Sequence, residues 1–443
     1  MLNARETAAR LGVKLDTLYA YVSRGMIHSV AVPGSRERHY READVERLHA
    51  GRGNGRGREA LIPVIDSAIC LIADGRFYYR GIDALRLADS ATLEAAAAVL
   101  WGGDIGQVIP QSACAESLAV QARTLKNPPS RRKPGPTRQQ LERGLVGPGF
   151  RREGVPARGE RVSGAKRRTG EGDTGRRADR PGLIERVQIR PATLAAADMA
   201  ALDLTRDGVA RTGAAILYEL AAAVSGTADA GEPVHAHLAA SWGLDAAGSD
   251  LVRRVLVLLA DHELNASTFV ARCVASTGAT PYAAVSAALS ALSGRRHGGA
   301  AARAEALFHQ IGHDADPMAV MAARLARDEA LPGLGQPLYP DGDPRARAII
   351  AAIAATRPAE GARIAAAAAA AMRLTGQHPN VDFALAAAAS ALGLLPGAAL
   401  SLFVVARSVG WIAHAIEQYD SDVLIRPRAR YTGPRPGGDG EPG

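Results

Sequence analysis

The residues that could perform chemistry lie where predicted loops meet predicted helices. His262 belongs to the polar run Asp261–Thr268, which interrupts an otherwise apolar stretch. His297 follows a predicted helix and is flanked by glycines, so a ligand can approach the backbone closely there. Asp382 falls in the first turn of a helix that Asn380 can cap, where the helix dipole favours the ionised carboxylate. An ionised carboxylate beside an apolar helix is a candidate general base.

Further candidates lie in a turn-rich loop and near the C-terminus. The loop Gly335–Arg345 is rich in Pro and Gly and contains Gln336, and Arg407 and Arg426 follow much later in the chain. Each candidate alone has a structural explanation, because an isolated histidine is more often a hydrogen-bonded core residue and a terminal arginine is usually solvated. A functional interpretation therefore depends on the combination.

The elements that must position these residues are predicted to be helices. Apolar residues make up 47% of the chain but aromatic residues only 4%, and the abundant alanine favours helix over strand. No stretch shows the period-2 alternation of a multi-stranded sheet. Ser249 is predicted to cap one helix, and Thr280-Pro281 to begin another that ends near Ser293. The apolar segment Phe383–Ala406 is broken by Pro396-Gly397, which predicts two buried helices joined by a turn rather than a membrane span.

The first fifty residues predict a small DNA-binding unit. Helices are expected over 5–11, 15–24 and 42–48, with an extended basic stretch over 27–40. This order resembles the winged helix-turn-helix of the MerR and excisionase families, in which the second helix enters the major groove and the wing contacts phosphate. The resemblance implies DNA contacts by Thr17, Tyr21, Arg24, Arg36 and Arg38. A helical appendage used for protein contacts is the alternative.

Charge and composition divide the 443 residues further. Residues 51–58 have the composition of a flexible linker, and residues 59–104 are predicted to be globular. Residues 126–182 carry a net charge of +10 and too few apolar residues to form a core, which predicts disorder. A nucleic-acid-binding arm and an out-of-frame coding stretch are the other interpretations of this segment. Regular helices are expected again over 183–434, followed by a disordered tail over 435–443.

Six sequence blocks resemble the citrate synthase family, in the family's order. They are DHELNAST (261–268), HGG (297–299), PLYPDGDPR (337–345), PNVDF (379–383), ARSVGWIAH (406–414) and IRPR (425–428). The resemblance covers 62–103 and 183–434. It implies a mainly α protein with all-helical large and small domains, working as a homodimer and preceded here by the winged helix-turn-helix.

The resemblance also implies a role for each candidate residue in joining acetyl-CoA to oxaloacetate. Asp382 matches the base that removes a proton from the acetyl methyl group, and His297 matches the donor to the thioester oxygen. The residues that match oxaloacetate ligands are His262, Arg345, Arg407 and Arg426, the last supplied across the dimer interface. No metal or redox cofactor is implied, and acetyl-CoA is a co-substrate.

One catalytic position departs from the family pattern. The family's loop before PLYPDGDPR reads Gly-x-Gly-His, and its histidine polarises the ketone of oxaloacetate, whereas this chain has Gln336. An amide can donate a hydrogen bond but cannot transfer a proton.

Two alternatives to citrate synthesis remain open. One is 2-methylcitrate synthesis from propionyl-CoA, which differs from citrate synthesis by a single methylene. The other is a DNA-binding regulator whose degenerate synthase body senses acyl-CoA or oxaloacetate. The N-terminus lacks the apolar run of a signal peptide, and the three cysteines are far apart, so we expect a cytoplasmic protein that uses neither a membrane nor a metal site.

Overall fold

The computed structural model describes residues 2–11, 18, 29–31, 38–41, 45, 65–102, 183–228, 231–429 and 431–433. The chain forms two compact units, Met1–Asp66 and Ser67–Gly443. The predicted linker, the basic segment 126–182 and the tail 435–443 lie outside the described residues. So do four of the predicted DNA contacts, Thr17, Tyr21, Arg24 and Arg36.

The described part of the N-terminal unit contains a helix and a strand pair. Helix α1 (Ala4–Leu11) begins at a capping box, in which Asn3 and Glu6 each accept a hydrogen bond from the other's backbone N–H at 2.9 Å. Strands β1 (Ser29–Ala31) and β2 (Arg38–Tyr40) pair antiparallel. The predicted first helix is therefore confirmed, and the extended basic stretch contains a strand pair. Among the described residues of this unit, the buried apolar side chains are Ala8, Leu11, Leu18, Tyr40 and Val45.

A small three-stranded sheet opens the second unit, and the sequence did not predict it. Its strands β3 (Cys70–Ala73), β4 (Arg76–Tyr79) and β5 (Ile82–Asp83) are antiparallel and adjacent in chain order. Each strand has at most four residues, which is too short for alternation to be recognised, although Phe77 and Tyr79 are fully buried.

Helices dominate the rest of this unit, which confirms the predicted mainly α fold. They are α4 (Ala84–Ser90), α5 (Leu93–Trp101), α9 (Leu183–Ala195), the 3₁₀ helix η2 (Met199–Leu202), α10 (Arg206–Ser225), α11 (Val234–Ser241), α12 (Ala246–Leu259), α13 (Ala266–Ala275), α14 (Pro281–Leu292), α15 (Gly299–Ile311), α16 (Pro317–Ala326), α17 (Pro344–Thr356), α18 (Pro358–Thr375), α19 (Val381–Ala391) and α20 (Ala398–Ser421).

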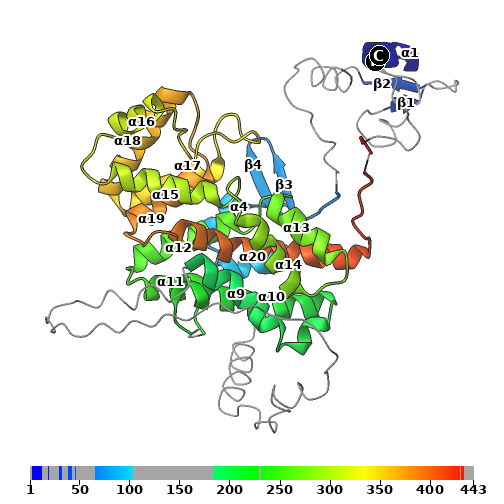
Figure 1. Ribbon diagram of the computed structural model, residues 1–443, viewed down its shortest axis with the longest axis horizontal. Helices are drawn as coiled ribbons and strands as arrows, with labels where there is room; N and C mark the ends of the chain where they lie inside the picture. Colours follow the sequence, from blue (N-terminus) through cyan, green and yellow to red (C-terminus); the bar gives the residue numbers. More distant parts are fainter. Residues whose placement is uncertain are drawn as a thin grey trace, which may run out of the picture. The chain divides into compact units, whose positions relative to one another are not determined.

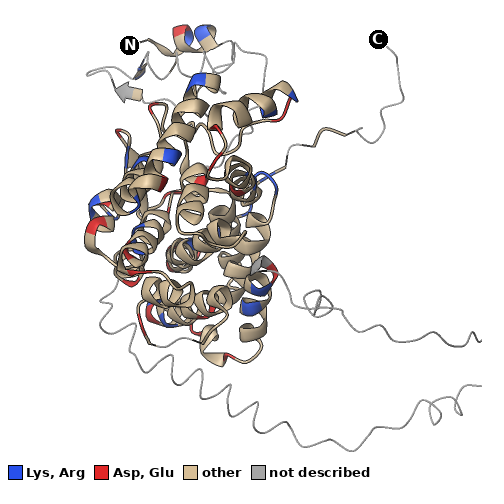
Figure 2. Ribbon diagram, turned by 90° about the vertical axis from the view of Figure 1, so that its left-hand side faces the viewer, with Lys and Arg blue, Asp and Glu red and all other residues tan. Residues whose placement is uncertain are grey.

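The helices form two groups around α20. Helices α15 to α19 pack on one another at one side, while α10 and α12 to α14 pack along α20 (Figure 1). In the described part of the chain, charged residues fall mainly on the outer helices and loops of the ribbon (Figure 2). Among the described helices, α20 is long and apolar enough to cross a membrane, but its apolar window is entirely buried within the protein. The prediction of two buried helices separated near Pro396-Gly397 is confirmed by α19 and α20.

Helix capping explains most helix starts near the candidate residues. Thr280 precedes α14 with Pro281 in its first turn, and Asn380 caps α19 by accepting hydrogen bonds from two backbone N–H groups, as predicted. The predicted cap at Ser249 is wrong. Asp245 caps α12 one turn earlier, because its carboxylate accepts the N–H of Gly248 at 2.8 Å.

Candidate active site

A tight turn between α12 and α13 presents His262. Asp261 Oδ2 accepts the N–H of Glu263 at 3.2 Å, and Glu263 adopts the left-handed conformation, with φ 57°. The hydroxyl of Tyr79 on β4 donates to Val257 O at 2.9 Å and accepts the N–H of Asp261 at 3.2 Å. The small sheet therefore supports this turn.

His262 is buried among cations. Its Nε2 lies 2.9 Å from the hydroxyl of Tyr339, which belongs to the turn-rich loop. Burial, together with the charges of Arg345 and Arg407, holds the pKa of His262 well below its usual value. A neutral imidazole beside two guanidinium groups can donate a hydrogen bond to a bound anion without repelling the arginines.

His297 lies in the loop that joins α14 to α15. Its Nε2 lies 2.9 Å from the hydroxyl of Ser267, which also accepts a hydrogen bond from Trp411 Nε1 at 3.2 Å. Its ring meets the ring of Phe403 edge to face, with the centroids 5.9 Å apart. Burial and the nearby Arg407 lower the pKa of His297 to about 4. The imidazole is therefore fixed in orientation and neutral at physiological pH.

Arg345 is held by its neighbour Asp343 at the start of α17. The Asp343 carboxylate accepts from Arg345 Nε at 3.0 Å and from Nη2 at 2.7 Å, and both side chains are buried. The same carboxylate accepts the N–H of Val381 at 3.2 Å, which ties the turn-rich loop to the start of α19. The positive charge of Arg345 is thereby fixed beside His262 and Asp382.

Asp382 is largely buried, and burial raises its pKa to about 6. Arg345 and Arg303 oppose this rise, while Asp343 adds to it. The start of α19 favours the ionised carboxylate, but the desolvation of the charged form outweighs this effect and leaves the pKa above its usual value. A carboxylate that titrates near neutrality is still suited to proton abstraction.

Arg407 is a fully buried cation with unused donors. Its Nε donates to Leu259 O at 2.9 Å, and its guanidinium carbon lies 4.7 Å from the centroid of the Phe403 ring. Nη1 and Nη2 are buried, and among the described residues neither has a hydrogen-bond partner. Because buried donors are nearly always satisfied, this pair of nitrogens is a candidate site for an anion.

The turn-rich loop places Gln336 next to the loop of Asp382. Gly335 N donates to His378 O at 2.8 Å, and Asn380 Nδ2 donates to Gly335 O at 3.0 Å. The side chain of Gln336 turns toward its own loop, where Oε1 accepts the N–H of Leu338 at 3.4 Å. Gln336 therefore borders the cluster, with its amide engaged locally.

Comparison of the sequence with models of known protein families identifies the family of this chain. The family model described as "Citrate synthase, C-terminal domain" matches residues 192–428, which is more than half of the chain. The chain belongs to the citrate synthase family. A second family model, "MerR HTH family regulatory protein", matches residues 2–52.

Individual relatives in the family carry two activities in their names. "Citrate synthase 2" of Bacillus subtilis is 38% identical over 201 residues, 41% of this chain and 50% of that protein. "2-methylcitrate synthase" of Mycobacterium tuberculosis is 38% identical over 189 residues, 40% of this chain and 47% of that protein. The chain thus spans about half the length of the curated relatives it matches.

Solved structures of the family share the fold. A citrate synthase from Thermoplasma acidophilum, in ternary complex with carboxymethyl coenzyme A and oxaloacetate, superposes with a TM-score of 0.60 at 20% identity. The superposition covers 84% of this chain and 95% of that one. At this level of identity the likeness concerns the fold alone.

The structure brings five of the seven predicted citrate synthase residues into one cluster: His262, His297, Arg345, Asp382 and Arg407. Gln336 borders this cluster, but Arg426 does not join it. Arg426 is exposed in the extended segment that follows α20, and no contact of its side chain with another described residue brings it to the cluster.

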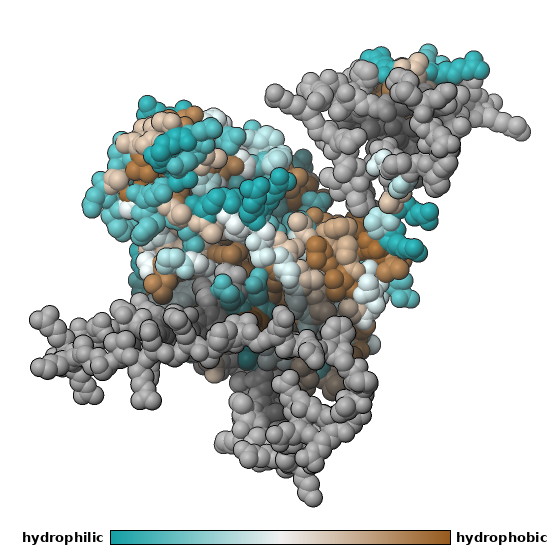
Figure 3. Space-filling view, viewed as in Figure 1, coloured by the Kyte–Doolittle hydropathy of each residue, from teal (hydrophilic) through white to brown (hydrophobic). Residues whose placement is uncertain are grey.

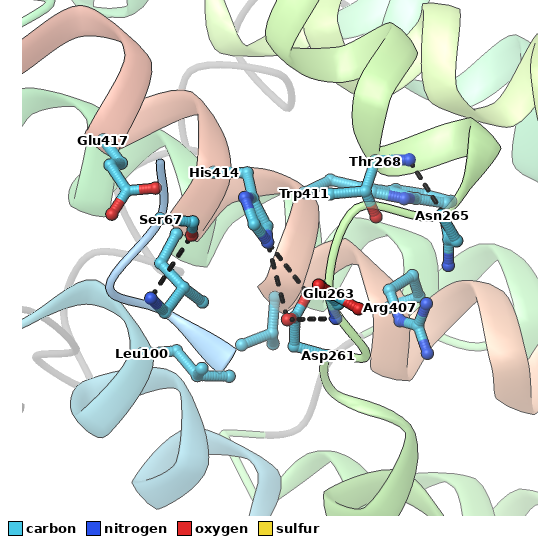
Figure 4. A network of polar contacts seen from close by, with 12 residues as sticks. Ser67, Leu100, Asp261, Glu263, Asn265, Thr268, Arg407, Trp411, His414 and Glu417 are labelled. Carbon is cyan, nitrogen blue, oxygen red and sulfur yellow. Dashed lines mark hydrogen bonds and ion pairs between the residues drawn. The ribbon is translucent and has the colours of Figure 1, made fainter. Parts of the chain in front are cut away.

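Sequence reasoning missed the residues that hold the cluster in place. They are Asp261, Ser267, Tyr339, Asp343 and His414, each of which contacts a candidate residue or its supporting loop. Figure 4 shows two of them, Asp261 and His414, beside Arg407. All five lie inside the sequence blocks that resemble the family. Their position in those blocks could have indicated that they matter for the site. The residues that they contact, however, are visible only in the structure.

Proposed function

We propose that this protein condenses an acyl-CoA with oxaloacetate and hydrolyses the resulting thioester, which gives citrate and CoA when the acyl group is acetyl. The observation that carries the proposal is the buried Arg407, whose two terminal nitrogens have no partner among the described residues. It lies near two histidines of lowered pKa, His262 and His297. Arg345, which also lies near His262, connects this group to the carboxyl of Asp382, whose pKa is about 6. These are the groups needed for binding an anion and for enolisation at one place.

The proposed reaction begins with Asp382 removing a proton from the acyl carbon next to the thioester. His297 stabilises the enolate by donating a hydrogen bond to the thioester oxygen. The carbanion carbon then forms a bond to the ketone carbon of oxaloacetate, and the alkoxide takes up a proton. Water cleaves the C–S bond of the new thioester, so that the carboxylic acid and the CoA thiol leave.

Arg407, Arg345 and His262 are the proposed ligands of oxaloacetate. Its carboxylates need guanidinium groups that are already desolvated and held in place, and Arg407 and Arg345 meet that requirement. The reaction as written uses only side chains, acyl-CoA and water, and we expect it to need no metal or redox cofactor.

Release of the CoA thiol tests the proposal directly. The purified protein is mixed with acetyl-CoA and oxaloacetate, and the free thiol is followed with a chromogenic disulfide, with Asp382→Asn as the matched control. We expect thiol release that depends on oxaloacetate in the natural protein and none in the variant. Release that persists unchanged in Asp382→Asn would remove Asp382 from the chemistry and contradict the proposal.

The choice between acetyl-CoA and propionyl-CoA is a separate question, because relatives include both citrate and 2-methylcitrate synthases. We propose acetyl-CoA as the preferred substrate. A single methylene changes binding in an apolar pocket by only about 1–3 kcal/mol, so both thioesters should react and kcat/KM must be compared. A higher kcat/KM with propionyl-CoA would make the protein a 2-methylcitrate synthase instead.

We further propose that the protein works as a homodimer through α13 and α14. Apolar residues gather on the face over these helices (Figure 3), where Phe269, Val270 and Val274 are only partly buried. An apolar patch of this kind is typical of interaction surfaces, and two-fold symmetric dimers are the commonest homo-oligomers. In a dimer, the exposed Arg426 of one chain would contribute to the active site of the other chain.

The N-terminal unit gives the second candidate function, binding to DNA. The match to MerR regulatory proteins favours it, and Arg38 lies exposed on β2, where its Nε donates to Ser29 Oγ at 2.9 Å. A regulator that senses oxaloacetate or acyl-CoA would bind these ligands without releasing thiol, so the assay above distinguishes the two functions.

A further inference from the structure

The carboxylate of Asp261 is fully buried between the turn that presents His262 and helix α20. Its Oδ2 accepts the N–H of Glu263, while Oδ1 has no hydrogen-bond partner among the described residues. A buried carboxylate with an unused oxygen is costly unless positive charge or a further hydrogen-bonding group lies nearby. Asp261 has such groups on two sides, and both sources belong to α20.

Arg407 and His414 are these two sources, and they lie on one face of α20 because they are seven residues apart. His414 is fully buried, and its Nε2 lies 3.4 Å from each oxygen of Asp261. The charge of Asp261 in turn supports the charged form of the buried Arg407, whose pKa is lowered chiefly by desolvation. Figure 4 shows the carboxylate between the imidazole and the guanidinium.

Gly410 lets the carboxylate approach α20 between Arg407 and His414. A Cβ at this position would lie 2.4 Å from Asp261 Oδ1 and 2.5 Å from Ala260 O, so any side chain would displace Asp261. The carboxylate thus packs against the backbone of α20. This packing fixes its position between the two side chains.

Other ionisable groups near the pair have partners of their own or stay neutral. Glu417 accepts the N–H of Ala68 at 2.8 Å and pairs with Arg272 at 2.7 Å. Burial and the charge of Asp261 raise the pKa of Cys70 to about 12, and burial keeps Tyr79 protonated. The remaining charge in reach of the carboxylate belongs to Glu263, which is exposed, and to Arg345, which Asp343 holds.

We propose that Asp261 and His414 form a positioning pair that sets the affinity of Arg407 for a substrate carboxylate. The negative charge of Asp261 opposes an anion on Arg407. His414, whose Nε2 lies 3.4 Å from both carboxylate oxygens, holds Asp261 in place. The identity of the anion as oxaloacetate rests on the proposed function, but the charge arrangement concerns any dicarboxylate that Arg407 holds.

The pair predicts tighter binding when the opposing charge is removed, which a purely structural role does not. Asp261→Asn keeps the shape and removes the opposing charge, so the Kd for oxaloacetate should fall about three- to tenfold. His414→Gln is the matched control, because it keeps a donor to Asp261, and its Kd should stay within about twofold of the natural value. The double variant should bind like Asp261→Asn. Titration calorimetry of the full chain without acyl-CoA measures all four values.

Thermal melts of each variant show whether it is folded. Weaker or unchanged binding in folded Asp261→Asn would overturn the pairing, because the carboxylate would then not oppose the anion. Tighter oxaloacetate binding in Asp261→Asn without any thiol release would leave the pairing intact and overturn the proposed enzymatic function instead.

Discussion

Asp382 shows how burial and neighbouring charges compete at a single carboxyl. The cap at Asn380 and the start of α19 favour the anion, yet desolvation raises the pKa to about 6. Arg345 and Arg303 stop it from rising further. A base of this strength is ionised at pH 7 and is still able to hold the proton it removes.

The first prediction follows from this pKa. If Asp382 must be ionised to act, kcat should rise with pH through about 6 and reach a plateau above it. The folded-state pKa lies above the usual value of 3.8, so ionised Asp382 lowers the free energy of unfolding above pH 6, and this penalty disappears below pH 4. Asp382→Asn should therefore raise the stability at pH 8 by roughly 1–2 kcal/mol after allowance for partial exposure.

Rate profiles and thermal melts at pH 4 and pH 8 check both parts. The stabilisation by Asp382→Asn should be seen at pH 8 and vanish at pH 4. A variant that is less stable at both pH values would show that the carboxyl stabilises the fold rather than straining it.

The second prediction concerns Gln336. Its amide can donate a hydrogen bond to a ketone but cannot pass a proton to the forming alkoxide. Gln336→His should therefore raise kcat by roughly 10-fold to 100-fold with a smaller effect on KM, because the new interaction strengthens mainly in the transition state. Steady-state thiol release under saturating oxaloacetate measures the change.

Gln336→Asn is the matched control, because it keeps the amide and shortens its reach. It should not gain activity. A natural protein that is already fast and unchanged in Gln336→His would mean that the glutamine is an adequate donor in this loop.

At the level of helices and strands, the sequence indicated most of the helices that carry the candidate residues. Capping residues and prolines marked α14 and α19, and the Pro396-Gly397 break separated α19 from α20. The three short strands β3 to β5 carried too few residues for their period to be visible. Ser249 resembles a cap because it precedes an apolar run, but Asp245 lies nearer the true helix start and accepts a free N–H group there.

Contacts between distant elements could not be predicted from spacing. The hydroxyl of Tyr79 reaches the turn of Asp261 across about 180 positions of the chain, and Asp343 ties its loop to Val381. These contacts depend on how the helices, strands and loops pack against one another. The spacing of apolar residues along a helix does not determine this packing. The candidate residues were visible in the sequence blocks, and the residues that hold them became visible only in the fold.

The third prediction belongs to α20. Gly410→Ala places a methyl group within 2.4 Å of the Asp261 carboxylate, where helix and turn are in direct contact. Overpacking of this kind typically costs about 1–3 kcal/mol. We expect a lower melting temperature and weaker oxaloacetate binding, because both Asp261 and the turn of His262 must move.

Ser408→Ala on the same helix is the control, since its hydroxyl donates to Val405 O within the helix. It should leave the melting temperature and binding nearly unchanged. If Gly410→Ala melts and binds like Ser408→Ala, the packing between α20 and the turn is looser than the structure indicates.

Positive charge is concentrated in two regions of the whole chain. Residues 1–58 carry a net charge of +5 and residues 126–182 a net charge of +10, whereas the rest of the chain has a net charge of −7. The basic N-terminal region is suited to binding a polyanion. The fourth prediction concerns that polyanion.

If the N-terminal unit binds DNA through phosphates, the affinity of the full chain should fall steeply as salt rises. Arg36→Ala together with Arg38→Ala should flatten this slope by about two units, because each arginine is expected to neutralise one phosphate. Fluorescence anisotropy with a labelled duplex at several salt concentrations measures it. Affinity that is indifferent to salt would exclude this mode of binding. An unchanged slope in the double variant would mean that other residues bind the phosphates.

The fifth prediction tests whether two chains share each active site. Arg426 lies exposed beyond the end of α20, whereas Asp382 lies in the cluster, so a dimer can combine the Asp382 of one chain with the Arg426 of the other. Arg426→Ala and Asp382→Asn should each abolish or nearly abolish thiol release. When the two variants are mixed and their subunits exchange, half of the hybrid molecules' sites carry both changes and the other half carry neither. Activity should then return to about one quarter of that of the natural protein at equal mixing, since random exchange makes half of all dimers hybrids with one intact site each. Exchange is followed independently by native mass spectrometry with one variant tagged.

The matched control mixes Asp382→Asn with His297→Ala, two residues of one cluster, and this mixture should stay inactive. If demonstrated hybrids of the first pair are equally inactive, Arg426 serves its own chain or no site at all.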